Sequence, residues 1–284
     1  MSLTLISGAV SESVNKVAPL LTLYLGQSVL TVSTFGSVQF AISYLDLFLP
    51  FIAFGYSGYG AIAIGRPESS SVPVSRVAPA IAALKLCHAL LAAIVAGLVL
   101  CLPRYSEYRG LIIALSFLFI SSALDTEHVH SGTQTLSARN LYSMISKAIC
   151  LAGVWLLVRS PDDGLRYGVL TALPNALVVV MSLVFSMRKI PWERPSLADI
   201  KTVLRMATPF GFTTILCLLV ERFDVFFVEA IGGSTAVGLY AGPLRVVQSI
   251  ATAATMVSNI FFSELVLIKE PRSFARHVEF SILT

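Results

Sequence analysis

Charged side chains are scarce in this chain of 284 residues. Only 13% of the residues are Asp, Glu, Lys or Arg, whereas 56% are apolar, and the mean hydropathy is +0.81. A soluble domain is about a quarter charged, because its surface must stay hydrated. The shortage of charge argues against a soluble enzyme, a disordered chain and a nucleic-acid-binding protein, and it favours a membrane protein.

Cysteine is also rare. The four cysteines are widely spaced, form no CxxC pair and lie mostly inside apolar runs; they are Cys87, Cys101, Cys150 and Cys217. We interpret them as small buried apolar side chains and not as disulfide partners or zinc ligands. Residues 1–16 also lack the pattern of a cleavable signal peptide, which is a basic stretch followed by a cleavage site of small residues.

Long apolar runs fill most of the chain. An α-helix needs about 20 apolar residues to cross a bilayer. Eight stretches approach this length, at residues 5–29, 36–64, 77–102, 110–132, 141–158, 167–187, 208–231 and 236–265. A membrane β-barrel would instead show strands of about ten residues with alternating hydrophobicity. The sequence therefore predicts an all-α, polytopic membrane helix bundle with about eight transmembrane helices.

Basic residues are distributed unevenly among the connections. With the N-terminus in the cytoplasm, thirteen of the 20 Lys and Arg residues lie in cytoplasmic segments, four in outer loops and three within spans. Cytoplasmic loops carry such an excess, so we predict this orientation. The longest connection is strongly basic and divides six spans from two. We therefore expect a first six-helix lobe at 1–187, a cytoplasmic linker at 188–207 and a partial second lobe, with two helices and a cytoplasmic tail, at 208–284.

Several ionisable side chains lie at membrane depth, namely Asp46, Lys85, His88, Arg222, Asp224 and Arg245. Each costs several kcal/mol in a bilayer unless it faces a partner or a wet cavity. One hypothesis is structural pairing between helices, for example of Asp224 with Arg245. Another is a hydrophilic cavity with a cationic lining that accepts an anionic ligand. A third is that some acidic side chains lie at the bilayer surface, as we expect for Glu221, Glu229 and Glu264.

The end of the fourth predicted span carries four potential metal ligands: Asp125, Glu127, His128 and His130. Two histidines in an HxH pair point about 200° apart on a helix, and the HExxH spacing is missing, so we expect no metal and no cofactor here. We predict that this end passes the cytoplasmic edge of the bilayer and is solvated. The alternative is a carboxylate or histidine coupled to protons.

The second predicted span combines small residues with a proline. A small residue recurs every four positions, at Ser57, Ala61 and Gly65, which favours close approach of another helix. Pro50 removes a backbone hydrogen bond near Asp46, so we predict a kink with a carboxylate beside it. Similar kinks are expected at two later prolines, Pro174 and Pro243.

Catalytic motifs are missing from the sequence. It contains no GxSxG motif and no evident Ser/His/Asp grouping, and its predicted outer loops are short. A membrane glycosyltransferase or acyltransferase would be expected to carry several polar residues in a large outer loop. We therefore predict that the protein is not an enzyme.

One region combines several motifs with the charges described above. Between residues 203 and 248 these are Pro209, Arg222-Phe223-Asp224, Gly232-Gly233, Val237-Gly238-Leu239-Tyr240 and Arg245. This region resembles the seventh and eighth spans of the oligosaccharide-lipid flippases, which belong to the MATE-like superfamily of multidrug and polysaccharide exporters. Residues 24–55 resemble the first turn and second span of that family, and Ala138-Arg139-Asn140 resembles its fourth-to-fifth connection.

The resemblance implies a bacterial inner-membrane protein with two six-helix lobes around a central cavity. It would move an oligosaccharide linked to undecaprenyl pyrophosphate across the membrane during O-antigen or capsule assembly. The basic residues expected to contact the pyrophosphate are Lys85, Arg222 and Arg245. The acidic residues expected to balance charge or couple to ions are Asp46, Asp125 and Asp224. The expected partners are the lipid-linked oligosaccharide, the bilayer and other polysaccharide-assembly membrane proteins, with no nucleic acid.

The resemblance also bears on the length of the chain. Members of that family have twelve or more spans, so a chain with about eight is expected either to be a truncated flippase, which we favour, or to be completed by helices of another chain. Two alternatives remain open, which are a cation-coupled multidrug exporter of the same superfamily and a membrane enzyme of polysaccharide assembly.

Overall fold

A computed structural model describes the backbone of residues 17–267 and their side chains, except at residues 69, 217–222 and from 249 onward. The described residues form helices and no strand, so the all-α prediction is confirmed. By their internal contacts, the residues divide into two compact units, Met1–Ala241 and Gly242–Thr284.

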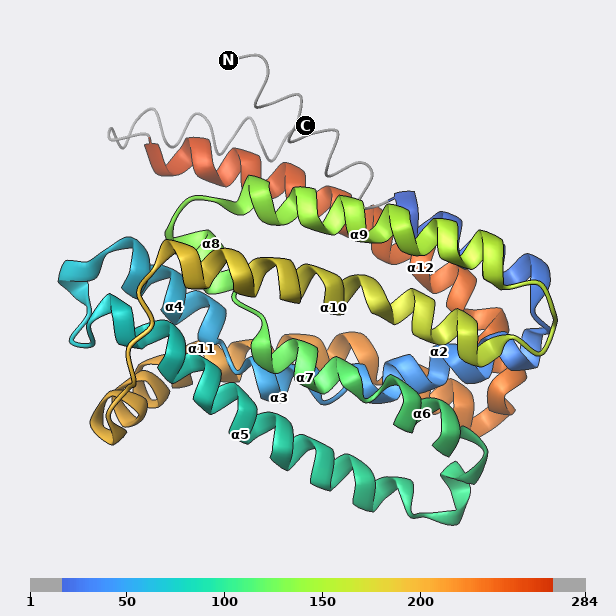
Figure 1. The fold of residues 1–284 in the computed structure, drawn as a ribbon. Coiled ribbons are helices and arrows are strands. Elements are labelled where there is room, and N and C mark those ends of the chain that lie inside the picture. The colour runs from blue at the N-terminus through green and yellow to red at the C-terminus, as the bar shows by residue number, and fades with distance from the viewer. Residues whose placement is uncertain (1–16, 268–284) are drawn as a thin grey trace. The chain divides into compact units, whose positions relative to one another are not determined.

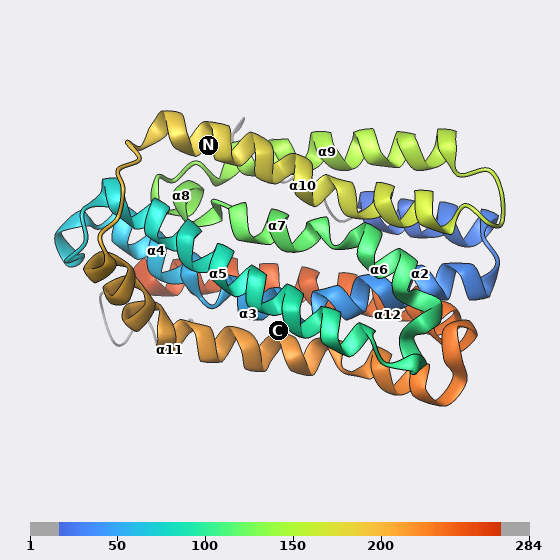
Figure 2. The ribbon, with the colours of Figure 1, turned by 60° about the horizontal axis from the view of Figure 1, so that its bottom comes forward.

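Helices follow one another through short connections, as Figures 1 and 2 show. Their bounds are Val17–Val29, α2 (Val32–Asp46), α3 (Leu49–Ala53), α4 (Tyr56–Gly65), α5 (Val74–Leu100), α6 (Arg109–Leu115), α7 (Phe117–Leu124), α8 (Glu127–Gly132), α9 (Leu136–Leu157), α10 (Gly164–Lys189), α11 (Leu197–Arg222) and α12 (Asp224–Leu267). Two 3₁₀ helices, η1 (Pro67–Ser69) and η2 (Pro103–Tyr108), lie in the connections.

Within the described part of the chain, five helices are long and apolar enough to cross a membrane. A sixth span results if the pair Pro103–Leu115 and Phe117–Gly132, bent by 42°, crosses as one. Eight spans were expected, and the difference lies at the first and the seventh. The described part of the first is the short helix Val17–Val29. The seventh is interrupted at Phe223, between the end of α11 and the start of α12.

The second span is broken beside Pro50, as predicted. α2 ends at Asp46, and Pro50 lies in the first turn of the short helix α3. Phe54 and Gly55 then adopt left-handed backbone conformations, with φ of 34° and 66°. A Cβ at Gly55 would lie 2.5 Å from the backbone nitrogen of Gly211, so only glycine fits this turn.

The other two prolines do not interrupt their helices. α10 is continuous across Pro174, and α12 is helical across Pro243. The non-helical residue inside α12 is Gly233, which has φ of 63°. The turn in this region therefore lies at the second glycine of the Gly232-Gly233 motif.

Close packing between α4 and α8 explains the small residues of the second span. A Cβ at Gly65 would lie 3.2 Å from the carbonyl oxygen of Gly132, and one at Gly132 would lie 2.7 Å from Cβ of Ile64. Gly60 similarly faces His128, whose Cβ would be 2.8 Å from an added methyl group. The predicted close helix approach is confirmed at the Gly65 end of this face.

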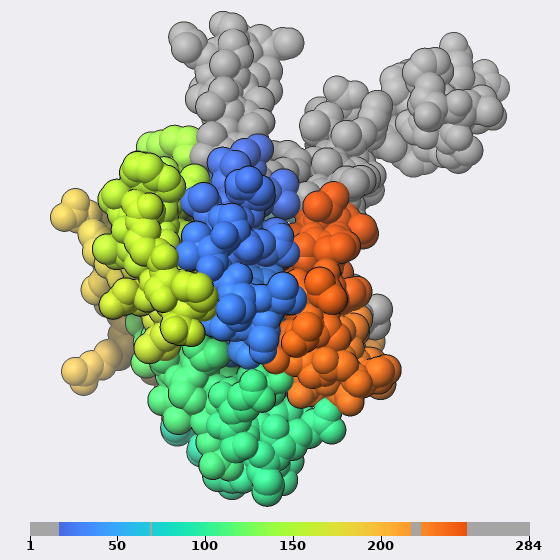
Figure 3. Space-filling view, turned by 90° about the vertical axis from the view of Figure 1, so that its right-hand side faces the viewer, coloured from blue at the N-terminus to red at the C-terminus, as the bar shows by residue number. Residues whose placement is uncertain are grey.

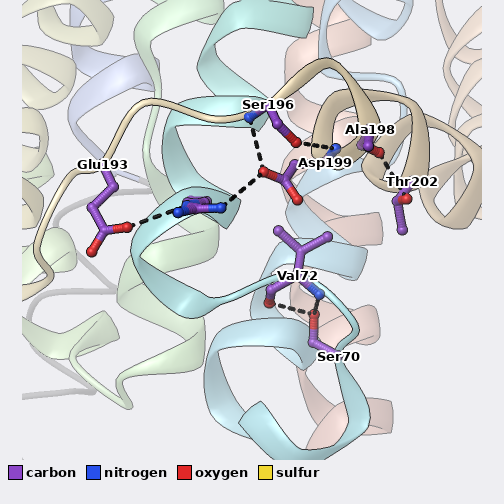
Figure 4. Close-up of polar contacts among 8 residues, drawn as sticks. Ser70, Val72, Glu193, Ser196, Ala198, Asp199 and Thr202 are labelled. Carbon is purple, nitrogen blue, oxygen red and sulfur yellow. Dashed lines mark hydrogen bonds and ion pairs between the residues drawn. The ribbon is translucent and has the colours of Figure 1, made fainter.

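The connection between α10 and α11 is attached to the beginning of α5. The side chain of Arg76 donates a hydrogen bond to Glu193 Oε2 at 3.2 Å and forms an ion pair of 3.7 Å with Asp199. Ser196 and Asp199 exchange hydrogen bonds at the start of α11 (Figure 4). Nearby, Ile190 is buried in an apolar cluster together with residues of α4 and α5.

Candidate functional site

Lys85 and Asp125, both predicted from the sequence, meet inside the first unit. Lys85 is 2% exposed, and its Nζ donates a hydrogen bond to the backbone carbonyl oxygen of Asp125 at 2.9 Å. The carboxylate of Asp125 accepts two hydrogen bonds from Nη2 of Arg139, at 2.8 and 3.0 Å. The carboxylate of Asp125 is therefore paired with Arg139, whereas Lys85 contacts the backbone of Asp125.

The break between α7 and α8 explains why the chain needs these contacts. Asp125 follows the last residue of α7, and its carboxylate accepts a hydrogen bond from the backbone N–H of Glu127 at 3.1 Å. Backbone groups at helix ends lack partners within the helix and must find them elsewhere. Asp125 thus provides an acceptor at the start of α8, and Lys85 provides a donor for a carbonyl oxygen at the end of α7.

A cavity of about 270 Å³ lies beside this ion pair. Its charged lining residues are Asp125, Arg139 and Lys147, and its polar ones include Ser143 and Asn175. These side chains come from α9 and α10 and from the break before α8. We call this space the first-lobe cavity. It combines two basic groups, one acidic group and neutral hydrogen-bonding groups, and its charged side chains are partly buried between helices.

Sequence reasoning missed Arg139 and Lys147, which it assigned to a cytoplasmic segment. α9 begins at Leu136, five residues before the predicted start at 141, so Arg139 belongs to the helix. Lys147 already lay within the span predicted at 141–158, although it was counted among the cytoplasmic basic residues. The missed signal was their spacing. Arg139, Ser143 and Lys147 are four residues apart and therefore lie on one face of a helix.

The predicted solvated end of the fourth span is wrong. His128 is 1% exposed and His130 is fully buried. The ring of His130 stacks on Phe185 of α10 with centroids 4.7 Å apart, while His128 packs against Gly60 of α4. The two imidazoles are buried because α8 packs between helices that are distant in the sequence. Among the residues that the structure describes, no group of three His, Cys, Asp or Glu side chains is arranged to hold a metal ion.

The remaining predicted acidic residues lie at helix breaks outside the first-lobe cavity lining. Asp46 is the last residue of α2, and Asp224 is the first residue of α12. The carboxylate of Asp224 accepts a hydrogen bond from the hydroxyl of Tyr240 and another from the backbone N–H of Val225. Both bonds lie within α12, so Asp224 stabilises the start of its own helix.

Two predicted basic residues are not tested by these contacts. The side chain of Arg222 lies outside the described residues, as do those of Glu221 and Glu264. Arg245 belongs to the second unit, Gly242–Thr284. Contact of Arg222 and Arg245 with a ligand, and pairing of Asp224 with Arg245, stay predictions.

A second group of polar residues lies near the α5–α6 connection. Glu229 of α12 forms an ion pair with Arg104 of η2 at 3.0 Å, and the hydroxyl of Tyr108 lies 3.4 Å from its other carboxylate oxygen. The Glu229 side chain is only 10% exposed. Glu229 is therefore largely enclosed and paired with Arg104, and its expected position at the bilayer surface stays a prediction.

Comparison with known proteins identifies the family. Residues 5–266 match the family model described as polysaccharide biosynthesis protein. No curated protein and no solved structure matches the chain. The family match covers most of the chain, agrees with the resemblance to polysaccharide flippases, and fits the five to six helices of membrane-spanning length. The chain therefore belongs to the polysaccharide biosynthesis protein family and is a multi-pass membrane protein.

Proposed function

We propose that the protein moves an oligosaccharide linked to undecaprenyl pyrophosphate from the cytoplasmic to the outer leaflet of the bacterial inner membrane, with its N-terminus in the cytoplasm. Membership of the polysaccharide biosynthesis family supports a role in polysaccharide export, and the apolar helices support action within the bilayer. A charged sugar headgroup cannot cross hydrocarbon unaided, because burying unpaired polar groups in lipid is costly. Transport is therefore favoured over an enzymatic role.

Alternating access requires two lobes that move against each other around a binding site. We assign residues 1–187 to the first lobe, 188–207 to a cytoplasmic linker and 208–284 to the second lobe. Arg222 and Arg245, both assigned to the second lobe, would each contribute positive charge for the pyrophosphate. The lipid tail would stay in the bilayer during the movement.

We assign ion coupling to the first-lobe cavity, because it holds a carboxylate that is paired with a guanidinium and adjoins an open space. Protonation of Asp125 would cancel the charge that holds Arg139 at 2.8 Å. Arg139 would then be released toward the cavity, on whose wall Lys147 also lies. Lys85 would act as a positioning residue, since it contacts the main chain of Asp125. In this proposal, binding of one proton to Asp125 is coupled to a movement of α9, which carries Arg139.

The transport proposal is tested in a strain that lacks the gene. We expect such a strain to lose surface polysaccharide and to accumulate lipid-linked repeat units in the membrane, and the wild-type gene to restore both. Normal surface polysaccharide without accumulation would overturn the proposal. Altered drug susceptibility with normal surface polysaccharide would identify a drug exporter instead.

The coupling site is tested in the same strain with substitutions that keep the side-chain shape. We expect Asp125→Asn to reduce surface polysaccharide at least about tenfold at equal protein level, because the amide cannot take up the proton that we assign to Asp125 and Arg139 keeps only its longer ion pair of 3.8 Å with Glu127. Arg159→Ala, on an exposed connection, serves as the control and should transport normally. Equal transport by both variants would remove Asp125 from the mechanism.

A further inference from the structure

At the end of the bundle with the α5–α6 connection, the first part of α12 contacts α2 and η2. We call these contacts the end seal, and its residues are Ser33, Gly36, Arg104, Glu229, Ser234 and Gly238. Figure 3 views this end, where the start of α2 lies beside the first part of α12. All of these residues belong to the same compact unit. Two of them belong to α2, one to η2 and three to α12.

Polar contacts connect the two sides of the end seal at two points. Arg104 Nη2 donates a hydrogen bond to Glu229 Oε2 at 3.0 Å. The hydroxyls of Ser33 and Ser234 are 2.9 Å apart. The guanidinium of Arg104 is half exposed, so its ion pair is accessible to water and can be exchanged for hydration at modest cost.

Backbone contact between α2 and α12 lies next to these polar groups. A Cβ at Gly36 would lie 1.8 Å from the carbonyl oxygen of Ser234, and one at Gly238 would lie 2.2 Å from that of Val32. Both distances are far below van der Waals contact. The two helices therefore meet through glycine, and any side chain at either position would separate them.

Aromatic rings fill the space beneath the helix crossing. The ring of Phe40 in α2 lies 4.5 Å from that of Tyr108 in η2 and 5.5 Å from that of Phe226 in α12, between centroids. Phe40 is fully buried and Tyr108 is 2% exposed. Rings from all three elements therefore pack together next to the crossing.

We propose that the end seal is the outer gate of the transporter and that the structure has this gate shut. The inference rests on the proposed function, because only alternating access requires a gate between the lobes. Under the proposed orientation, the seal faces away from the cytoplasm. It joins residues of the first lobe to residues of the second, so opening to the outside must part Gly36 from Gly238 and break the Arg104–Glu229 ion pair.

A reversible cross-link tests the gate. The double variant Ser33→Cys with Ser234→Cys would be made in a background with the four native cysteines replaced by alanine, after showing that this background transports. We expect mild oxidant to form the disulfide in membranes, to reduce surface polysaccharide at least about tenfold, and a reductant to restore it. Each single variant should transport normally. Failure of the disulfide to form, or normal transport by the cross-linked protein, would overturn the proposal.

A matched pair controls for the cross-link itself. Thr34→Cys with Gly164→Cys joins α2 to α10, two helices of the first lobe, at a point where Cγ2 of Thr34 would lie 2.6 Å from an added Cβ. We expect this pair to cross-link without loss of transport. An equal loss in both pairs would show that the end seal has no special role and would overturn the gate.

Charge reversal provides a readout that does not depend on transport. With Ser234→Cys as a reporter, which is less exposed than Ser33, Arg104→Glu should increase labelling by a membrane-impermeant maleimide severalfold, and adding Glu229→Arg should return it toward the original rate. Unchanged labelling in the single reversal would count against the gate. The labelling and the gene deletion can give different answers. If labelling follows this pattern but deletion of the gene leaves surface polysaccharide normal, the gate is supported and only the polysaccharide cargo is rejected.

Discussion

Ser196 and Asp199 form a reciprocal cap at the start of α11. The backbone N–H of Ser196 donates to Asp199 Oδ2 at 2.9 Å, and the backbone N–H of Asp199 donates to Ser196 Oγ at 3.1 Å. Hydrogen bonding of the carboxylate to the backbone N–H and the side chain of Ser196, with a smaller contribution from Arg76, holds the pKa of Asp199 below its ordinary value of 3.8. The cap therefore favours the ionised carboxylate in the folded state.

This depressed pKa predicts a dependence of stability on pH. A carboxylate whose pKa is lower in the folded state stabilises the protein above its unfolded pKa of about 3.9, and the contribution disappears as the pH falls through the folded pKa. We therefore expect Asp199→Asn to lower the unfolding temperature most above pH 5 and hardly at all near pH 2. Thermal unfolding in detergent across this range measures the difference, with the exposed Asp162→Asn as control. A difference that stays constant with pH would contradict the cap's electrostatic role.

At the scale of elements, the crossing of α4 and α8 depends on glycine. A methyl group at Gly132 would lie 2.7 Å from Cβ of Ile64 and 3.0 Å from the carbonyl oxygen of Ala61, and neither atom can move without shifting a helix. We expect Gly132→Ala to destabilise the protein by about 1–3 kcal/mol through overpacking. Unfolding in mixed detergent measures the loss.

Gly97 offers the matched control for this crossing, because it also lies inside a helix but has no atom within 4 Å of an added Cβ. Gly97→Ala should be neutral or should stabilise the protein by up to about 1 kcal/mol, since alanine favours helix over glycine. The same destabilisation at both positions would show that helix propensity, and not packing, sets the effect.

Element-scale features differ in how far the sequence could predict them. The break at Pro50 and the close approach at Gly65 follow from local chemistry, namely a missing N–H and a missing side chain. Burial of His128 and His130 requires α4 and α10, whose residues are far away in the chain, so the local polar pattern indicated solvent instead. Arg139 was misplaced for a smaller reason, which is that the predicted helix began five residues too late.

Whole-molecule features follow mainly from composition. Hydropathy was sufficient to predict an all-α membrane bundle, and the family match supports the predicted class of transporter. The number of spans was harder to predict, because the break at Phe223 divides an apolar run that looks continuous in the sequence. Composition does not encode where backbone hydrogen bonds stop.

Orientation is the whole-molecule property most open to measurement. Glu68 in η1 and Asp162 in the α9–α10 connection are both exposed and are predicted to lie on opposite sides of the membrane. We expect a membrane-impermeant maleimide to label Asp162→Cys in intact spheroplasts and Glu68→Cys only after lysis, in a background without native cysteines. The reverse pattern would invert the proposed topology and the side on which the end seal closes.

The left-handed turn at Phe54 and Gly55 has a mechanical consequence. A continuous helix transmits tilt along its whole length, because each residue is tied to the one four positions earlier. Here that ladder stops, with the N–H of Phe54 bonded to Pro50 and the next bonds starting anew from the carbonyl of Gly55. α2, which takes part in the end seal, and α4, which packs against α8, are therefore not joined by a continuous ladder of backbone hydrogen bonds. The half of this span in one leaflet can change its tilt without breaking the backbone hydrogen bonds of the half in the other leaflet.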